Sequence, residues 1–232
     1  MADLGTGAFA NLRRYREADA IDAVVISHMH ADHFLDVVPM RYALKYGERS
    51  RPRKPELYLP PGGEAMLREL VAAFAPESGD FIGDVFDVRT YDPEAPLAIG
   101  DVSVRFAPTS HYVPTYAFRF DAGGASVAYS ADTAPDERVA ALARGVDAFV
   151  CEATLAPDGE AEEPRGHLSA REAAAMAEAA GVRRLLISHY PASADTGALE
   201  AAARAVYRGD VTVVDDGFSL ALAGVPGASP VP

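Results

Sequence analysis

Four short apolar runs in this sequence each lead almost directly into a histidine or an aspartate. The pairs are residues 24–27 before His28, residues 105–107 before His111, residues 128–130 before Asp132, and residues 185–188 before His189. Such runs predict β-strands, and loops at strand ends are where a rigid sheet presents functional side chains. Packing alone does not require four strands to end in metal-ligand residue types, so the pattern indicates a site.

The alternation of such runs with helical stretches predicts an α/β fold. Strands are expected at residues 23–27, 56–59, 102–107, 116–120, 126–130, 148–151, 184–188 and 211–214. Helices are expected at residues 12–18, 35–46, 64–75, 135–143, 170–180 and 198–207. The helix at residue 170 has the clearest boundaries, because Ser169 and Glu172 form a capping-box pattern and Gly181 can end it. Without a repeat or a linker, residues 1–232 are expected to form one domain.

Charge and composition exclude several classes of protein. A net charge of −13 disfavours long nucleic acids as partners, because non-specific binding to them needs clustered lysine and arginine. Small anionic substrates remain open. The single cysteine, Cys151, excludes an internal disulfide. No apolar run approaches the roughly 20 residues that span a bilayer, so no membrane partner is expected and a cytoplasmic location is predicted.

The segment His28-Met29-His30-Ala31-Asp32-His33 packs three imidazoles and a carboxylate into six residues. In an extended turn, residues two apart point the same way, so His28 and His30 can converge on one ion while Asp32 and His33 turn toward a second position. The alternative is a polar loop with three unrelated histidines. His111 and His189 would each be structural if taken singly, but together they supply the further ligands that this segment requires.

These residues resemble the signature of the metallo-β-lactamase superfamily over about residues 3–217. The resemblance implies a four-layer αββα sandwich that binds two divalent metal ions at one edge of its two sheets. It implies that His28, His30 and His111 hold one ion, that Asp32, His33 and His189 hold the other, and that Asp132 bridges them. Zn²⁺ is the expected metal, and Mn²⁺ or Fe²⁺ also suit imidazole and carboxylate ligands.

Two further motifs resemble the ribonuclease Z-like branch of that superfamily. Cys151-Glu152-Ala153-Thr154 matches a His-Glu-Ala-Thr segment, with cysteine where the branch usually has histidine, and Gly166-His167-Leu168-Ser169 matches a Gly-His-x-Ser/Thr helix entry. The resemblance implies that His167 and Glu152 act together as a proton donor. A helix N-terminus disfavours an imidazolium, and a nearby Glu152 would restore its proton. The alternative is that His167 only packs there and Glu152 only satisfies backbone amides.

The chain departs from the branch in two places. Twenty residues separate His111 from Asp132, enough for two strands and a turn at Gly123-Gly124, whereas ribonuclease Z carries a long tRNA-binding arm there. Family members also usually have strands before the position of Asp3-Leu4-Gly5. The N-terminal strands of the first sheet are therefore expected to be missing, which would leave an exposed or partner-covered edge. A homodimer is the assembly that the family analogy suggests.

The expected function is two-metal hydrolysis of a small molecule. Metal-bound hydroxide would be the nucleophile, oriented by Asp32 and Asp132, and His167 would protonate the leaving group. A dedicated acid favours a phosphodiester with a poor leaving group, such as a cyclic nucleotide or a nucleotide ester. Two alternatives remain: a carboxyl-ester, lactone or thioester hydrolase, and a non-catalytic metal-binding scaffold.

Overall fold

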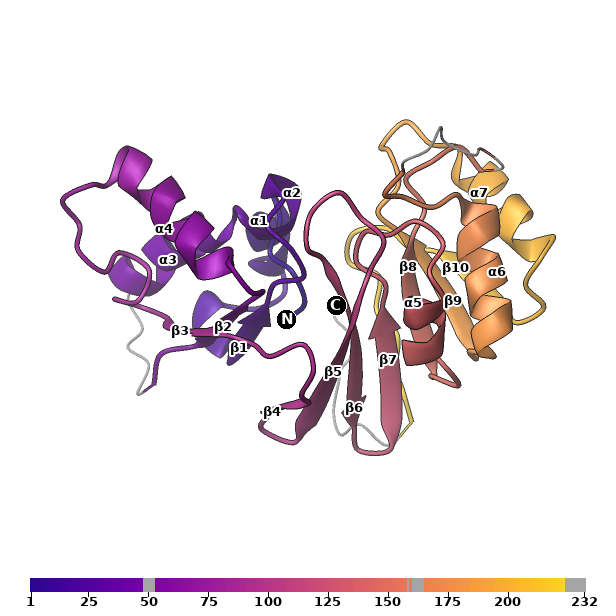
Figure 1. Ribbon diagram of the computed structural model, residues 1–232, viewed down its shortest axis with the longest axis horizontal. Helices are drawn as coiled ribbons and strands as arrows, with labels where there is room; N and C mark the ends of the chain where they lie inside the picture. Colours follow the sequence, from indigo (N-terminus) through magenta and orange to yellow (C-terminus); the bar gives the residue numbers. More distant parts are fainter. Residues whose placement is uncertain (48–52, 158, 160–164, 224–232) are drawn as a thin grey trace. The chain divides into compact units, whose positions relative to one another are not determined.

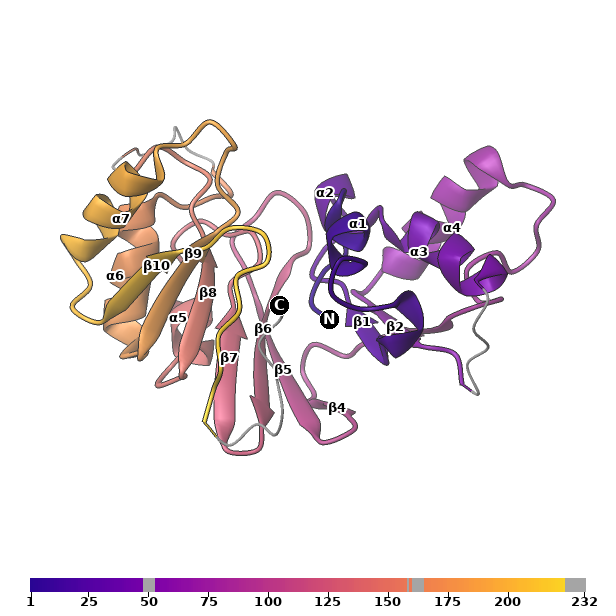
Figure 2. The ribbon, with the colours of Figure 1, turned by 180° about the vertical axis from the view of Figure 1, so that it is seen from behind.

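The computed structural model describes residues 1–47, 53–157, 159 and 165–223 (Figures 1 and 2). Contacts between Cα atoms divide the chain into two compact units, Met1–Asp92 and Pro93–Pro232. Each unit has its own sheet and its own buried cluster of apolar side chains. That residues 1–232 behave as one domain stays a prediction.

The first unit is built around a short parallel sheet of order β1-β2-β3. Its elements are α1 (Ala8–Leu12), a 3-10 turn η1 (Ala18–Ala20), β1 (Ala23–Val25), α2 (Ala31–Phe34), α3 (Val37–Tyr46), β2 (Glu56–Leu59), α4 (Gly63–Phe74) and β3 (Asp87–Thr90). Helices provide the crossovers that parallel neighbours need. Leu57 and Leu59 of β2 are fully buried and pack with Phe86 and Met40 into this unit's core.

Residues 1–3 run along the outer edge of β1. Ala2 forms a parallel bridge with Val25, and the amide of Asp3 donates to the carbonyl of Val25 at 2.9 Å. The described residues of this sheet contribute three strands and this bridge. That a partner covers the edge stays a prediction.

The second unit contains a seven-stranded mixed sheet of order β10-β9-β8-β7-β6-β5-β4. Its elements are β4 (Leu97–Ile99), β5 (Val102–Pro108), β6 (Tyr116–Ala122), β7 (Ala125–Tyr129), α5 (Glu137–Leu142), β8 (Ala148–Glu152), α6 (Ala170–Ala180), β9 (Arg184–Ser188), α7 (Thr196–Arg204) and β10 (Asp210–Val213). Helices α5, α6 and α7 cover one face of this sheet (Figure 1). Strands β4 to β7 are antiparallel neighbours and β7 to β10 are parallel ones.

Helix α6 begins and ends as its sequence predicts. The Ser169 side chain accepts from the amide of Glu172, Glu172 accepts in return from the amide of Ser169, and Gly181 ends the helix with φ of 60°. The buried face of α6 carries mainly alanine, which lets the helix approach the sheet closely. This well-capped start holds the segment of His167 in place.

The predicted α/β class is confirmed, with helices flanking both sheets. The helix predicted at residues 12–18 is wrong: the chain forms α1 at Ala8–Leu12 and then the 3-10 turn. The turn into α1 starts at Gly7, whose φ of 88° suits glycine, and the Asp36 carboxylate binds the amide of Phe9 at 2.9 Å. The unpredicted strand β3 is mostly exposed and lacks an apolar pattern, and the unpredicted strand β4 is three residues long, too short for its pattern to indicate a strand.

The predicted short connection between His111 and Asp132 is confirmed. Strands β6 and β7 form a hairpin whose turn residues, Gly123 and Gly124, both have positive φ. Every residue from 111 to 132 is described by the structure, and this stretch contains no additional arm.

Candidate metal-binding and catalytic residues

The first unit gathers its four candidate ligands on one loop after β1. His30 is the N-cap of α2, so Asp32 and His33 lie in the first turn of that helix. Nε2 of His28 and Nδ1 of His30 are 3.1 Å apart, and the ring centroids of His28 and His33 are 4.1 Å apart. Two nitrogens bound to one tetrahedral zinc at about 2.0–2.1 Å lie ~3.3 Å apart, so the spacing of His28 and His30 fits a shared ion.

Asp3 anchors this loop through hydrogen bonds, a role that was not predicted from the sequence. Its carboxylate accepts from the amide and the hydroxyl of Ser27 at 2.7 and 2.8 Å, and from Nδ1 of His33 at 2.8 Å. Because the Ser27 hydroxyl donates to Asp3, its oxygen accepts from Nδ1 of His28 at 3.0 Å. Asp3 therefore directs His33 itself and His28 through Ser27, and leaves Nε2 of each ring for a metal.

Gly5 allows the N-terminal segment to pack this tightly against the loop. A Cβ at Gly5 would lie 1.5 Å from the carbonyl oxygen of Asp32, so no other residue fits without displacing the backbone. The sequence signal that could have identified this role is an aspartate two residues before a glycine, because aspartate tolerates the positive φ of 53° that Asp3 adopts.

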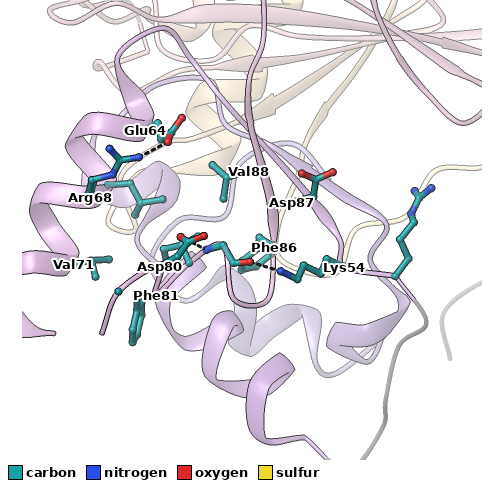
Figure 3. A pocket seen from close by; sticks show the side chains of 14 residues that line it. Lys54, Glu64, Arg68, Val71, Asp80, Phe81, Phe86, Asp87 and Val88 are labelled. Carbon is teal, nitrogen blue, oxygen red and sulfur yellow. Dashed lines mark hydrogen bonds and ion pairs between the residues drawn. The ribbon is translucent and has the colours of Figure 1, made fainter. Parts of the chain in front are cut away.

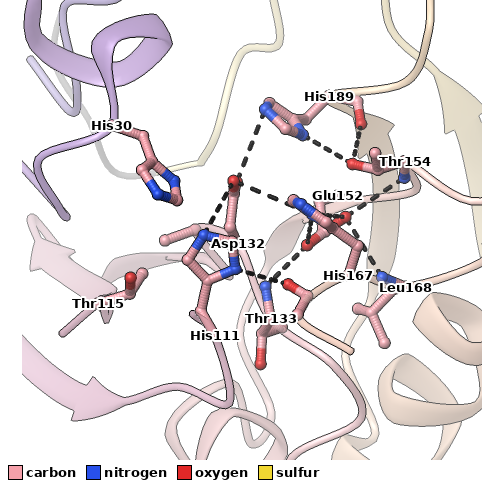
Figure 4. A network of polar contacts seen from close by, with 12 residues as sticks. His30, His111, Thr115, Asp132, Thr133, Glu152, Thr154, His167, Leu168 and His189 are labelled. Carbon is pink, nitrogen blue, oxygen red and sulfur yellow. Dashed lines mark hydrogen bonds and ion pairs between the residues drawn. The ribbon is translucent and has the colours of Figure 1, made fainter. Parts of the chain in front are cut away.

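The second unit takes its three candidate metal ligands, His111, Asp132 and His189, from three separate segments (Figure 4). Strands β5, β7, β8 and β9 run in the same direction, so their carboxyl ends meet at one edge of the sheet. His111, Asp132, Glu152 and His189 lie at or just beyond those ends, and His167 lies shortly before α6. The sheet therefore brings together residues up to 78 positions apart, since 189 − 111 = 78.

Asp132 lies at the centre of this group and is buried. Its Oδ1 is 3.6 Å from Nε2 of His189, and its Oδ2 is 3.8 Å from Nε2 of His111 and 4.0 Å from Nδ1 of His167. The possible ligand atoms of Asp132, His167 and His189 all lie within 4.8 Å of one another. These spacings are too long for direct hydrogen bonds and suit groups that share a cation.

Hydrogen bonds select which nitrogen of each histidine can bind a metal. Nδ1 of His111 donates to the carbonyl of Gly166 at 2.7 Å. The Thr154 hydroxyl donates to the carbonyl of His189 at 3.0 Å, so its oxygen accepts from Nδ1 of His189 at 2.9 Å. Both rings therefore turn an Nε2 lone pair toward the Asp132 carboxylate, and the donor set fits a divalent cation. Thr154 belongs to the Cys151–Thr154 motif, but its contact with His189 was not predicted from the sequence.

Backbone strain is concentrated among these residues. In the described part of the chain, the non-glycine residues with positive φ are Asp3, Ala131 and His189. Asp3 binds a candidate ligand, Ala131 precedes Asp132, and His189 is itself a candidate. Such conformations cost about 1–3 kcal/mol each and persist at functional sites where the surrounding structure holds them.

Glu152 and His167 are in contact, as the sequence predicts, and Glu152 also binds backbone amides. Nδ1 of His167 lies 3.0 and 3.2 Å from the two Glu152 oxygens. The same carboxylate accepts from the amides of Thr133, Thr154 and Leu168 at 2.7, 3.3 and 3.3 Å. Glu152 thus has a rigid position fixed by backbone amides, from which it binds the His167 ring.

Cys151 precedes Glu152 but points into the core. It is fully buried, and burial raises the pKa of its thiol, so it is no nucleophile at neutral pH.

A pocket of about 640 Å³ in the first unit, between α4 and residues 79–88, contains none of the predicted site residues (Figure 3). Two of the cations that line this pocket have partners within it: Lys54 donates a hydrogen bond to the carbonyl of Gly83, and Arg68 forms an ion pair with Glu64.

Within the described residues, every helix is too short or too polar to cross a membrane.

Comparison with known proteins identifies the family. Residues 3–190 match the model of the beta-lactamase superfamily domain. The chain is 35% identical to the uncharacterized protein Rv1339 of Mycobacterium tuberculosis over 96% of this chain and 81% of that protein. It is 31% identical to ribonuclease Z of Mycobacterium bovis over 75% of this chain and 68% of that protein.

A solved structure supports the same assignment. The probable metallo-hydrolase YhfI of Bacillus subtilis is 29% identical over 94% of this chain and 86% of that protein. Its crystal structure, described as a metallo-beta-lactamase fold protein, superposes with a TM-score of 0.83, covering 94% of this chain and 85% of that one. The chain therefore belongs to the metallo-β-lactamase superfamily, in its ribonuclease Z-like branch, and is a metallo-hydrolase.

Proposed function

We propose that this chain is a dinuclear metal-dependent phosphodiesterase that acts on small substrates such as cyclic nucleotides or nucleotide esters. The proposed ligands are His28, His30, Asp32, His33, His111, Asp132 and His189, with Zn²⁺ as the first candidate and Mn²⁺ or Fe²⁺ as alternatives. The observation that carries the proposal is the His167–Glu152 pair beside Asp132. A metal site alone can hydrolyse many esters, but a dedicated proton donor suits a poor leaving group.

When bound, two divalent ions would supply a water of lowered pKa and stabilise negative charge on the substrate. Asp32 and Asp132 accept hydrogen bonds from the attacking water and orient it. Glu152 binds Nδ1 of His167 and stabilises the imidazolium, which can then give its Nε2 proton to the departing oxygen. The departing sugar alkoxide is a strong base and a poor leaving group. Protonation of this oxygen is therefore the step to which His167 contributes most.

Small substrates are favoured over tRNA for two reasons. Strands β6 and β7 are joined by a tight turn of two glycines, at the place in the chain where ribonuclease Z carries its tRNA-binding arm. The net charge of −13 also opposes the binding of a long polyanion.

The test begins with metal analysis of the purified protein and a panel of bis-nitrophenyl phosphate, cyclic nucleotides, lactones and thioesters. Cleavage of the phosphodiesters is expected. Turnover of lactones or thioesters alone would make the chain a carboxyl-ester or thioester hydrolase, and normal metal content without any turnover would make it a scaffold.

The proton donor is tested with His167→Ala on two phosphodiesters. Turnover should fall by about 10²–10⁴-fold for an alkyl leaving group and survive for nitrophenolate, which leaves without a proton. Glu178→Ala is the matched control, because it removes a carboxylate from α6 away from the start of the helix that holds His167. It should affect both substrates equally. Equal losses from His167→Ala on both substrates would remove the acid role.

A further inference from the structure

The ring of Tyr112 lies at the exposed end of a row of histidine rings in the second unit. Its centroid is 5.0 Å from that of His111 and 5.9 Å from that of His167, and His167 stacks with His189 at 6.0 Å. Tyr112 is the member of this row that is neither a proposed metal ligand nor the proposed proton donor. It lies directly beside the proposed proton donor, and hence beside the place where a leaving group would stand.

Tyr112 is exposed to solvent. Its side chain is 60% exposed, and among large apolar side chains in residues 93–157, 159 and 165–223 only Phe218 is also exposed. An aromatic ring has a large apolar face against which another ring can stack. An exposed ring at this point therefore offers a stacking surface to whatever binds next to His167.

The edge of the Tyr112 ring packs against the backbone of Gly166. A Cβ at Gly166 would lie 2.8 and 2.9 Å from two ring carbons of Tyr112 and 2.7 Å from Nδ1 of His111. The backbone of Gly166 also accepts the hydrogen bond of His111. One glycine thus positions both a candidate metal ligand and the tyrosine ring, so the ring is placed relative to the reacting end of the substrate.

We propose that Tyr112 stacks against the nucleobase of the substrate and makes the enzyme selective for nucleotide phosphodiesters. The inference rests on the proposed phosphodiesterase function and narrows it. In a cyclic nucleotide, the leaving oxygen belongs to the sugar that carries the base, so a base beside His167 lies within reach of a neighbouring ring. Stacking of a base on an aromatic side chain tolerates every base, because each has a flat π-face.

The kinetic test compares a substrate with its base-free counterpart. With cyclic AMP, Tyr112→Ala should raise KM by about tenfold and leave kcat nearly unchanged, while Tyr112→Phe should keep the wild-type KM. With 1-O-methylribose 3′,5′-cyclic phosphate, which lacks the base, all three proteins should have the same KM. The control is Tyr46→Ala, since Tyr46 is 72% exposed on α3 and its ring lies against Tyr42 of the same helix. Equal losses on both substrates, or no change on either, would overturn the proposal.

A binding test separates this inference from the proposed function. The chain contains no tryptophan, so Tyr112→Trp creates a single fluorescent reporter at this position. Adenosine 5′-monophosphate should quench its emission in the metal-loaded protein, and the matched Tyr46→Trp variant should not respond. Quenching without any phosphodiester hydrolysis would retain the base site and reject the proposed reaction. Hydrolysis of cyclic AMP without quenching would reject the base site and retain the reaction.

Discussion

The two units contribute candidate metal ligands in opposite ways. The first unit places all of its ligands in six consecutive residues, between β1 and α2, so the local chain path decides their arrangement. The second unit takes one ligand from each of several segments, and the common direction of β5, β7 and β9 decides where they meet. A contiguous group is visible in a sequence, whereas a dispersed group becomes a site only through strand order.

The supporting contacts differ in the same way. In the first unit one carboxylate, Asp3, directs two histidines, one of them through Ser27. In the second unit each histidine has its own partner: Gly166 for His111, Thr154 for His189 and Glu152 for His167. Loss of one supporting residue should therefore do more damage in the first unit than in the second.

The largest effect is expected from the proposed bridging ligand. Asp132→Ala should remove both metal ions and lower turnover of bis-nitrophenyl phosphate by at least about 10³-fold, because the charge stabilisation by the ions is lost. Asp32→Ala, on the exposed part of the loop, should remove one ion. Metal analysis measures the stoichiometry, and equal metal loss in both variants would contradict the bridging role.

Core substitutions should reveal whether the two units unfold together. Leu57 and Leu185 are both fully buried, one in each unit, so Leu57→Ala and Leu185→Ala should each lower the free energy of unfolding by about 2–5 kcal/mol. If residues 1–232 form one domain, both variants shift a single transition. Hydrogen exchange measures the unfolding of each unit separately. If Leu57→Ala destabilises only the first unit and Leu185→Ala only the second, the single-domain prediction is wrong.

The supporting residues should tune metal affinity by smaller amounts. Asp3→Asn keeps the shape and the tolerance for positive φ but removes the charge, and it should weaken metal binding about 100-fold. Thr154→Val should weaken it about tenfold, and Thr154→Ser should restore it. Competition with a chromophoric chelator measures both affinities. A larger loss in Thr154→Val than in Asp3→Asn would reverse the proposed difference between the units.

The smallest effect is expected at Cys151. Burial raises the pKa of its thiol, so the thiolate fraction should stay negligible as pH rises through about 8.5, where an exposed cysteine ionises. Its reaction with a thiol reagent should show no increase between about pH 7 and pH 9 and should appear only on unfolding. Cys151→Ala should retain full turnover. Rapid labelling of the folded protein would show that the residue is accessible.

Local patterns in the sequence were sufficient for much of the fold. The capping box of α6 and the glycines of the β6–β7 turn act over a few residues, and both are found where they were predicted. The errors arose where distant contacts decide. Helix α1 forms earlier than its periodicity suggests because Asp36, 27 positions from Phe9, binds its first turn.

The family, the loop of His28 to His33 and the residue types able to bind metals could be predicted from the amino-acid sequence, because these depend on short motifs and their spacing. The fold was needed to find that Asp3 and Thr154 orient histidine rings, that Glu152 binds both backbone amides and His167, and that Tyr112 is exposed beside them. Hydrogen bonds select one nitrogen of each imidazole through space, and strand order determines which side chains come within that reach.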